Sequence, residues 1–341
     1  MAQRRFYIGV DVSKDSLDVA FIDAQHKEII DHMQVSNDDQ GMDQMTGWLQ
    51  SHASFDLAQT LFCMEATGLY CYSLLQFLQQ NNGAVWVENA VQIKRSLGIV
   101  RGKNDKVDAK RIAQYALKHE DRVRLWQPRR EVIEKLKHLA AMRDRLVETK
   151  KGLVVPVKEF RDCGNEPMAK ILEKSMRKSL RAIDSDIESI EKQLREIIDH
   201  DDHLRKLFSL ITSVAGVGMV TAINLIVHTN EFKILLDARK LACYCGIAPF
   251  EHTSGKSIRG KTRVHPMANK KLKTNLHMAS LSGVKVDLEL KKYYERKVAE
   301  GKSKLSVLNA VKNKIVARVI AVVKRGTPYE KKIILNSLAV S

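Results

Sequence analysis

Three consecutive strand patterns within the first 35 residues constrain the fold more than any other feature of the chain. The first is a short apolar run, the second alternates, and the third follows a turn at 23–26. Further strand patterns then alternate with helical ones. The strand patterns lie at 6–10, 17–22, 28–35, 60–64 and 84–87, and the helical patterns continue to residue 118. A meander followed by alternating strands and helices predicts an α/β fold with a mixed sheet covered by helices.

This order of elements is the one found in ribonuclease-H-like domains, so we expect such a domain over residues 1–125. A helical segment with a coiled-coil seam is expected over 126–204, because apolar residues recur there at spacings of three and four between Leu180 and Ile197. That seam can close on the preceding helix or on another subunit. A mainly α-helical domain is expected over 205–341.

The helix that precedes the seam is expected to cover residues 131–151. Residues 154–170, which contain Pro156, Gly164 and Pro167, are expected to interrupt the helical pattern.

Charge is distributed unevenly along the chain, whose formal net charge is +17. The first hundred residues contain 12 acidic and 6 basic side chains, whereas residues 251–341 contain 6 acidic and 21 basic ones. An acidic front can bind cations, and a basic tail can bind phosphates. The distribution therefore favours nucleic-acid chemistry over binding alone.

Cysteine usage and hydropathy place the chain in the cytoplasm. The five cysteines include no CxxC pair and no zinc-type spacing, which is typical of thiols in a reducing compartment. The N-terminus leads directly into a strand pattern without an apolar signal region, and no apolar stretch is long enough for a membrane span. We therefore expect no contact with a membrane.

Four acidic residues are the candidate catalytic groups. Asp11 follows the first apolar strand pattern and Glu65 follows the fourth, and in a ribonuclease-H-like order these strands are neighbours. Asp105 and Asp108 lie three residues apart at the start of a helical pattern, hence on one face. Alone, each acid is more often a helix cap or a surface charge. Asp15 and Asp18 are interpreted as surface residues.

Carboxylates gathered in this way repel one another, and divalent cations relieve that repulsion. Hard oxygen ligands suit Mg²⁺ or Mn²⁺. Two such ions about 4 Å apart can activate an oxygen nucleophile and stabilise the leaving oxygen of a phosphodiester. Asp11, Glu65, Asp105 and Asp108 are thus predicted metal ligands.

Five blocks of sequence resemble the DEDD transposases of bacterial insertion sequences, a family that includes Piv-type DNA invertases and recombinases guided by a structured bridge RNA. The resemblance covers nearly the whole chain. The blocks are YIGVDVSKDSLDVAF, CMEATGLY, RGKNDKVDAKRIAQYA, SVAGVGMVTAINLI and LACYCGIAPFEHTSGKSIRGKTRV. It implies a RuvC-like N-terminal domain in which Asp11, Glu65, Asp105 and Asp108 bind the metal.

The resemblance also implies a catalytic serine in the C-terminal domain, which becomes joined to a DNA end. The family pattern of Ser-Gly, a second Ser and Arg-Gly corresponds to residues 254–260, so Ser254 is the implied nucleophile. From spacing alone, Ser254 is a serine of a flexible loop, and Ser257 and Thr253 are neighbouring candidates. A serine hydroxyl needs a metal or a base to lose its proton.

Basic residues and glycines of the C-terminal half are candidates for binding nucleic acid. Gly216 and Gly218 resemble the turn of a helix-hairpin-helix module, although a plain tight turn between helices would also need glycine. Lys273 stands where the family often has Arg, and it lacks the bidentate fork of Arg. The expected nucleic-acid-binding residues are Lys256, Arg259, Lys261, Arg263, Lys270, Lys271, Lys273, Gly216 and Gly218.

The expected function is that of a transposase or site-specific recombinase acting on insertion-sequence ends and target DNA. The resemblance implies a structured non-coding guide RNA, and a homodimer or homotetramer is expected. A metal-dependent hydrolytic nuclease or junction resolvase is the alternative with the same fold. An actin-like ATPase or sugar kinase is disfavoured because no later Gly-rich adenosine-binding segment follows and the basic tail has no role there. A non-enzymatic nucleic-acid-binding scaffold is a further alternative, which would bind independently of metal and would not cleave.

Overall fold

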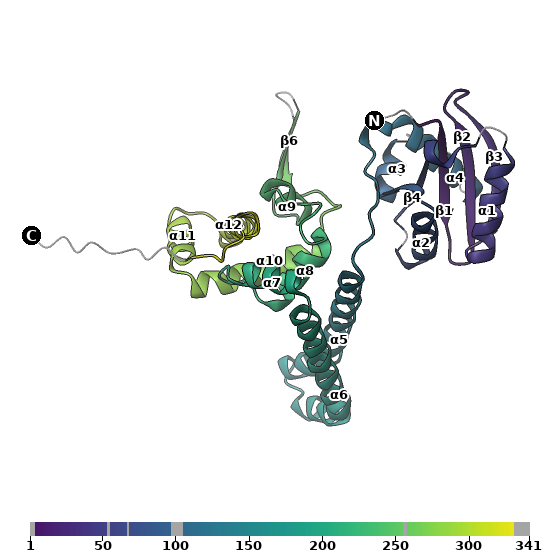
Figure 1. The fold of residues 1–341 in the computed structure, drawn as a ribbon. Helices are drawn as coiled ribbons and strands as arrows, with labels where there is room; N and C mark the ends of the chain where they lie inside the picture. The colour runs from purple at the N-terminus through teal and green to yellow at the C-terminus, as the bar shows by residue number, and fades with distance from the viewer. Residues whose placement is uncertain (1–3, 53–54, 67, 97–104, 255–257, 331–341) are drawn as a thin grey trace, which may run out of the picture. The chain divides into compact units, whose positions relative to one another are not determined.

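The computed structural model describes residues 4–52, 55–66, 68–96, 105–254 and 258–330 (Figure 1). The chain divides into two compact units, residues 1–128 and 129–341. The first unit consists of β1 (Phe6–Val12), β2 (Ser16–Asp23), β3 (Glu28–Ser36), α1 (Asp39–Ser51), β4 (Thr60–Glu65), α2 (Tyr72–Gln80), β5 (Ala84–Glu88), α3 (Ala90–Ser96) and α4 (Asp105–Lys118).

The five strands of the first unit form one sheet in the order β3-β2-β1-β4-β5. β1 is antiparallel to β2 and parallel to β4, and β4 is parallel to β5. The predicted meander and the predicted mixed sheet are both confirmed.

Alternation along β1 assigns its side chains to the two faces of the sheet. Phe6, Ile8 and Val10 belong to a core with buried residues of α1 and α2, whereas Tyr7 belongs to a core with α4. The apolar faces of these helices cover the two sides, and Trp86 of β5 is buried on the α4 side. The sheet is thus enclosed on both faces, as an α/β fold requires.

Gly9 allows α4 to lie directly on the sheet. A Cβ atom at Gly9 would come within 2.2 Å of the carbonyl oxygen of Ala109 and 2.3 Å of the amide nitrogen of Ala113. These are backbone atoms of α4, which cannot move aside as a flexible side chain can. The absence of a side chain at this position therefore sets the distance between helix and strand.

The second unit is mainly helical. It consists of α5 (Glu131–Asp162), α6 (Glu166–Asp199), α7 (Asp202–Thr212), α8 (Met219–Thr229), α9 (Ala238–Tyr244), β6 (Phe250–Ser254), β7 (Ile258–Arg263), α10 (Lys270–Val286), α11 (Leu288–Ala299) and α12 (Lys304–Arg325). Within the described ranges, no helix is both long enough and apolar enough to cross a membrane.

Helices α5 and α6 form an antiparallel hairpin (Figure 1). Ion pairs join the two helices, and their residue numbers rise along α5 while they fall along α6. These pairs are Arg143–Glu191 at 2.7 Å, Lys150–Asp184 at 2.5 Å and Arg161–Glu173 at 2.6 Å. The predicted seam at Leu180–Ile197 lies in helix α6, so part of it packs against α5 of the same chain.

The expected interruption at residues 154–170 is present but shorter, because α5 continues through Pro156 to Asp162 and α6 begins at Glu166. Proline costs the helix one backbone hydrogen bond, to residue 152. Val157 is buried next to it, and Ala169 of α6 is fully buried. Packing between the two helices compensates for the lost bond, and the chain turns only at 163–165.

A buried ion-pair cluster fixes the start of α5 to the helical core. The side chain of Glu231 is fully buried and pairs with Arg130, which also bonds Asp201 Oδ2 at 2.6 Å. Glu231 lies in a run of three residues with positive φ, residues 230–232. Because αL backbone costs energy for residues other than glycine, the Arg130 contacts help to hold this strained turn.

Replacing Gly9 with alanine is expected to destabilise the first unit by about 1–3 kcal/mol, because α4 must move away from β1. All three tryptophans, Trp48, Trp86 and Trp126, lie in this unit, so tryptophan fluorescence during urea unfolding measures the change. Gly47→Ala is the matched control, since a Cβ there meets nothing within 4 Å. It should stabilise α1 by about 0.5–1 kcal/mol. Equal midpoints for the two variants would contradict the close approach of α4.

Candidate active site

Asp11 and Glu65 occupy equivalent places on neighbouring parallel strands. The register pairs Val10 of β1 with Met64 of β4, so the next residue on each strand is an acid. Both acids are half-buried. Because side chains alternate between the faces of a sheet, Asp11 lies on the same face as Gly9, and Glu65 on the same face as Cys63. This is the face that α4 covers.

The first turn of α4 brings the other two acids to that face. Asp105 is the first residue of α4, and Asp108 is one turn further on. The same helix crosses Gly9 at Ala109 and Ala113, which places its N-terminal turn toward the Asp11 end of β1. Asp108 accepts a 2.7 Å bond from Arg111, and acids in the first turn are favoured by the helix dipole.

The electrostatics of Asp11 show that the four acids lie near one another. Its pKa is raised to about 6, first by burial and then by the negative charges of Asp105, Asp108, Glu65 and Asp18. Such an effect requires charges close to the Asp11 carboxyl group. The fold therefore brings the charges of Glu65, Asp105 and Asp108 within electrostatic range of Asp11, although separate segments carry them.

Asp18 is a fifth acid of this group, and its interpretation as a surface residue is wrong. It is only 4% exposed and faces Asp11 directly across the β1–β2 pair. Its two oxygens bond His32 Nε2 and Gln34 Nε2, each at 2.9 Å. Asp18 lies on the same face of β2 as the apolar residues Ala20 and Ile22, and this alternation predicts its burial. Asp15, by contrast, is exposed as expected.

Glu88 is a further strand-end acid that the sequence reading missed. It ends β5 and pairs in register with Glu65, and its Oε2 lies 3.3 Å from the hydroxyl of Tyr115 in α4. The rule that identified Asp11 and Glu65, an acid directly after an apolar strand, applies equally to residues 84–88. Three strand ends thus carry acids at one edge of the sheet.

The donor set, by its chemistry, suits a hard divalent cation. It consists of carboxylates alone, and the raised pKa of Asp11 shows the repulsion that a bound cation would relieve. Across the described ranges, no three or more histidine, cysteine, aspartate or glutamate side chains stand in a ready metal-binding arrangement.

Ser254 is the last residue of β6, in a hairpin of the second unit. β6 and β7 are antiparallel, with Thr253 opposite Arg259 and Ser254 opposite Ile258. The backbone of the serine is therefore held by strand pairing at the end of a hairpin strand, whereas spacing alone indicated a loop. Arg259, Lys261 and Arg263 belong to β7, and Lys256 and Ser257 lie outside the described residues.

The lysines that begin α10 differ in how they are engaged. Lys271 pairs with Asp144 of α5 at 2.5 Å, so part of its charge is neutralised within the chain. Lys270 is exposed, and Lys273 is half-buried. The N-cap Asn269 accepts a bond from the Leu272 amide at 2.9 Å and thereby satisfies one free donor of the helix.

Gly216 and Gly218 have different surroundings in the turn between α7 and α8. Gly216 has φ +87°, and a Cβ there would lie 2.3 Å from the Ala279 carbonyl oxygen of α10. Its requirement for glycine is thus explained by packing. Gly218 is exposed, has open space around it and caps α8 without a side-chain bond. The first amides of α8 therefore receive no side-chain cap from this residue.

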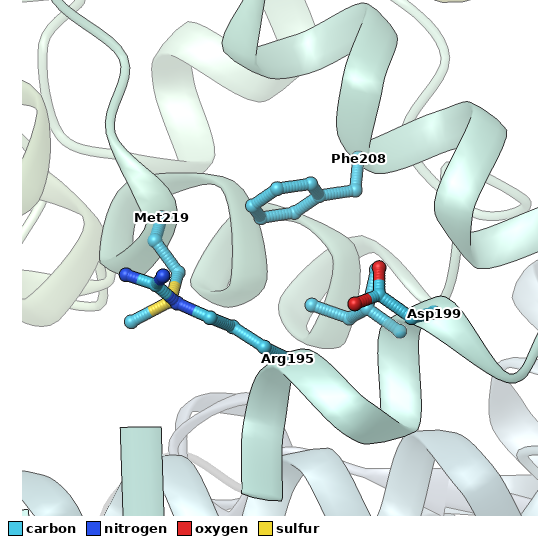
Figure 2. Close-up of a pocket in the computed structure, with 5 residues that line it drawn as sticks. Arg195, Asp199, Phe208 and Met219 are labelled. Carbon is cyan, nitrogen blue, oxygen red and sulfur yellow. The ribbon is translucent and has the colours of Figure 1, made fainter. Parts of the chain in front are cut away.

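A cavity of about 280 Å³ lies beside the start of α8. Figure 2 shows Arg195 stretched beside Met219, with Asp199 one turn further along α6. Arg195 Nε lies 3.4 Å from Met219 Sδ. The lining residues are Arg195, Ile198, Asp199, Phe208 and Met219. Because the lining carries charges of both signs, the cavity itself does not single out an anion.

Comparison with known proteins matches both units to transposases. A transposase model of the IS110 DEDD type matches residues 8–156, and a model of the IS116/IS110/IS902 transposase family matches residues 208–295. The chain is 27% identical over 338 residues to the pilin gene-inverting proteins of Moraxella bovis and Moraxella lacunata, covering 96% of this chain and 98% of each relative. An uncharacterised 43.6 kDa protein of insertion element IS110 from Streptomyces coelicolor is 28% identical over 158 residues, or 46% of this chain and 38% of that protein.

The family matches agree with the geometry at both ends of the chain. The first model spans the acids gathered around Asp11, and the second spans the hairpin that carries Ser254. The resemblance expected from the five sequence blocks is confirmed. The chain therefore belongs to the IS110-type DEDD transposase family and is a DNA recombination enzyme.

Proposed function

We propose that this enzyme cuts and rejoins DNA strands at the ends of an insertion sequence and at its target, with the Asp11 group as its metal site and Ser254 as its nucleophile. The observation that carries the proposal is the effect of Asp105, Asp108 and Glu65 on the Asp11 carboxyl group. This effect supports the proposal that the four acids, which separate segments carry, act together where a phosphodiester and its cations would bind.

The roles of the residues follow from their chemistry. Asp11, Glu65, Asp105 and Asp108 would hold Mg²⁺ or Mn²⁺, and the bound ions would neutralise charge on the phosphate and lower the pKa of the attacking hydroxyl. Ser254 Oγ loses its proton and attacks phosphorus. The bond from phosphorus to a deoxyribose oxygen breaks, and that oxygen takes a proton. Attack by a DNA hydroxyl on the serine phosphoester then rejoins a strand and restores the serine.

Basic side chains of the second unit would bind the DNA backbone near the serine. Three of them, Arg259, Lys261 and Arg263, are on β7, the strand that follows Ser254 in the chain. Lys256 lies between Ser254 and β7 in sequence. Guanidinium groups bind phosphate oxygens in pairs and stabilise negative charge that develops there. The exposed Gly218 end of α8 and the lysines of α10 would extend this contact.

Trapping of a covalent intermediate tests the serine mechanism. The wild-type enzyme with Mg²⁺ and a plasmid carrying element ends should form a protein–DNA adduct that resists denaturant. Ser254→Ala should abolish the adduct, and Asp11→Asn should reduce it more than about a hundredfold. Asp15→Asn, an exposed acid four residues from Asp11, is the matched control and should retain it.

Two outcomes of the trapping experiment would redirect the proposal. An adduct that survives Ser254→Ala but not Ser257→Ala would assign the nucleophile to Ser257. Metal-dependent cleavage that leaves only free ends would identify a hydrolytic nuclease or junction resolvase, in which water attacks.

The pH dependence of stability tests the metal site without measuring catalysis. An aspartate with a pKa of about 6 in the folded state and about 4 in the unfolded state stays protonated to a higher pH when the protein is folded. Without divalent ions, its contribution to stability is thus greatest below pH 4, declines as pH rises through 6 and stays low above. Asp11→Asn should remove this decline and raise the melting temperature at pH 8.

Addition of Mg²⁺ at pH 8 should stabilise the wild-type protein and leave Asp11→Asn nearly unchanged, because only the former retains the ligand set. Differential scanning calorimetry measures both effects. A melting temperature that responds equally to Mg²⁺ in the two proteins would contradict a metal site at Asp11.

A guide RNA and a homodimer or homotetramer complete the proposal. Family resemblance supports a structured non-coding RNA that selects the donor and target sites, and more than one subunit would let acids and serine come from different chains. Sequencing of RNA that co-purifies with the protein tests the first point. Recovery of only random cellular RNA would contradict it.

A further inference from the structure

Lys312 is a buried lysine without a counter-ion in the described part of the chain. It lies in the middle of α12 and is only 6% exposed, between the fully buried Val311 and Ile315. None of the ion pairs or hydrogen bonds within the described residues involves its ammonium group. Lysine is rarely buried unless it is paired.

The same helix shows how a partly buried cation is ordinarily satisfied. Arg318, less than two turns further along α12, pairs with Asp287 at 3.1 Å and with Glu289 at 2.8 Å. Lys312 is at least as buried, but no acid within the described residues pairs with it. Its nearest charged influence is another cation, because burial and then the positive charge of Lys273 lower the pKa of Lys312.

The helices that carry the two lysines, α12 and α10, both contact the turn that leads to the serine hairpin. The amides of Asn309 and Asn313, which flank Lys312 on α12, donate to the carbonyl oxygen of Ile247 at 2.7 and 3.1 Å. A methyl group at Gly246 would lie 3.6 Å from Cδ of Lys273. The turn at 246–247 precedes β6, which begins at Phe250.

The ammonium group of Lys312 is not fully enclosed. Its Nζ is not among the fully buried side-chain atoms that lack a partner within the described residues. The long apolar stem is thus buried, while the ammonium group keeps some contact with solvent. Two cations near one turn, neither of them ion-paired within the described residues, attract a polyvalent anion.

We propose that Lys312 and Lys273 together bind a backbone phosphate of nucleic acid at the base of the Ser254 hairpin. The inference deepens the proposed function, because a strand held there would enter the hairpin that carries the serine. The ligand is a phosphodiester strand, since residues 251–341 contain 21 basic and 6 acidic residues and many such contacts would act together.

Salt-dependent binding tests this site. The full-length Lys312→Met and Lys273→Met variants are titrated by fluorescence anisotropy with duplex DNA of an element end and with single-stranded RNA. EDTA is present, so no cleavage occurs. Each variant should bind about tenfold more weakly at low salt. The slope of log affinity against log salt should fall by about 0.9 for duplex DNA and about 0.7 for a single strand.

Lys304→Met is the matched control, because it removes an exposed lysine from the first turn of the same helix. It should change affinity less than either site variant. Thermal unfolding adds a second readout: Lys312→Met should melt at the same or a higher temperature, since it removes an unpaired buried cation. Weaker binding without loss of stability is the signature of a ligand-binding lysine.

Each other outcome is decisive. A loss of affinity no larger than that of Lys304→Met in both site variants would overturn the inference. So would a destabilised Lys312→Met combined with unchanged binding by Lys273→Met, because Lys312 would then serve packing. A loss with DNA alone or RNA alone would identify the strand. Absence of a serine adduct would contradict the proposed function and leave the binding result intact.

Discussion

The contact between α4 and Gly9 of β1 is the constraint on which the candidate active site depends. Backbone atoms of Ala109 and Ala113 lie where a side chain of residue 9 would be. Because α4 packs directly on the backbone of β1, its first turn lies toward the edge of the sheet at which β1 ends. The charges of Asp105 and Asp108 therefore act on the Asp11 carboxyl group, because the helix that carries them packs directly on the strand that carries Asp11.

Most of the first unit could be predicted because its signals are local. Apolar runs and alternation identify all five strands, and the strand-end rule identifies Asp11 and Glu65. The same local signals predict the burial of Asp18, from the alternation along β2, and the strand-end position of Glu88. The convergence of the α4 acids on Asp11 was harder to predict, because it depends on a contact between residues about a hundred positions apart.

The second unit was less predictable, since long-range packing decides its details. Pro156 is a local signal for a helix end, but contacts between α5 and α6 outweigh one lost backbone bond. Gly216 has the local signature of a phosphate-binding turn, yet its conformation is required by α10. Lys312 has no local signature at all. Its burial is visible only when α12 is packed against its neighbours.

Two sets of charges in this protein oppose folding when no ligand is present. The carboxylates around Asp11 repel one another, and Lys312, which has no ion pair within the described residues, is further destabilised by the charge of Lys273. A sequence selected for stability alone would pair or replace such groups, as α12 pairs Arg318. Under the proposed function, a DNA strand with divalent cations would supply both missing partners, because its phosphates would pair with the lysines and its cations with the acids.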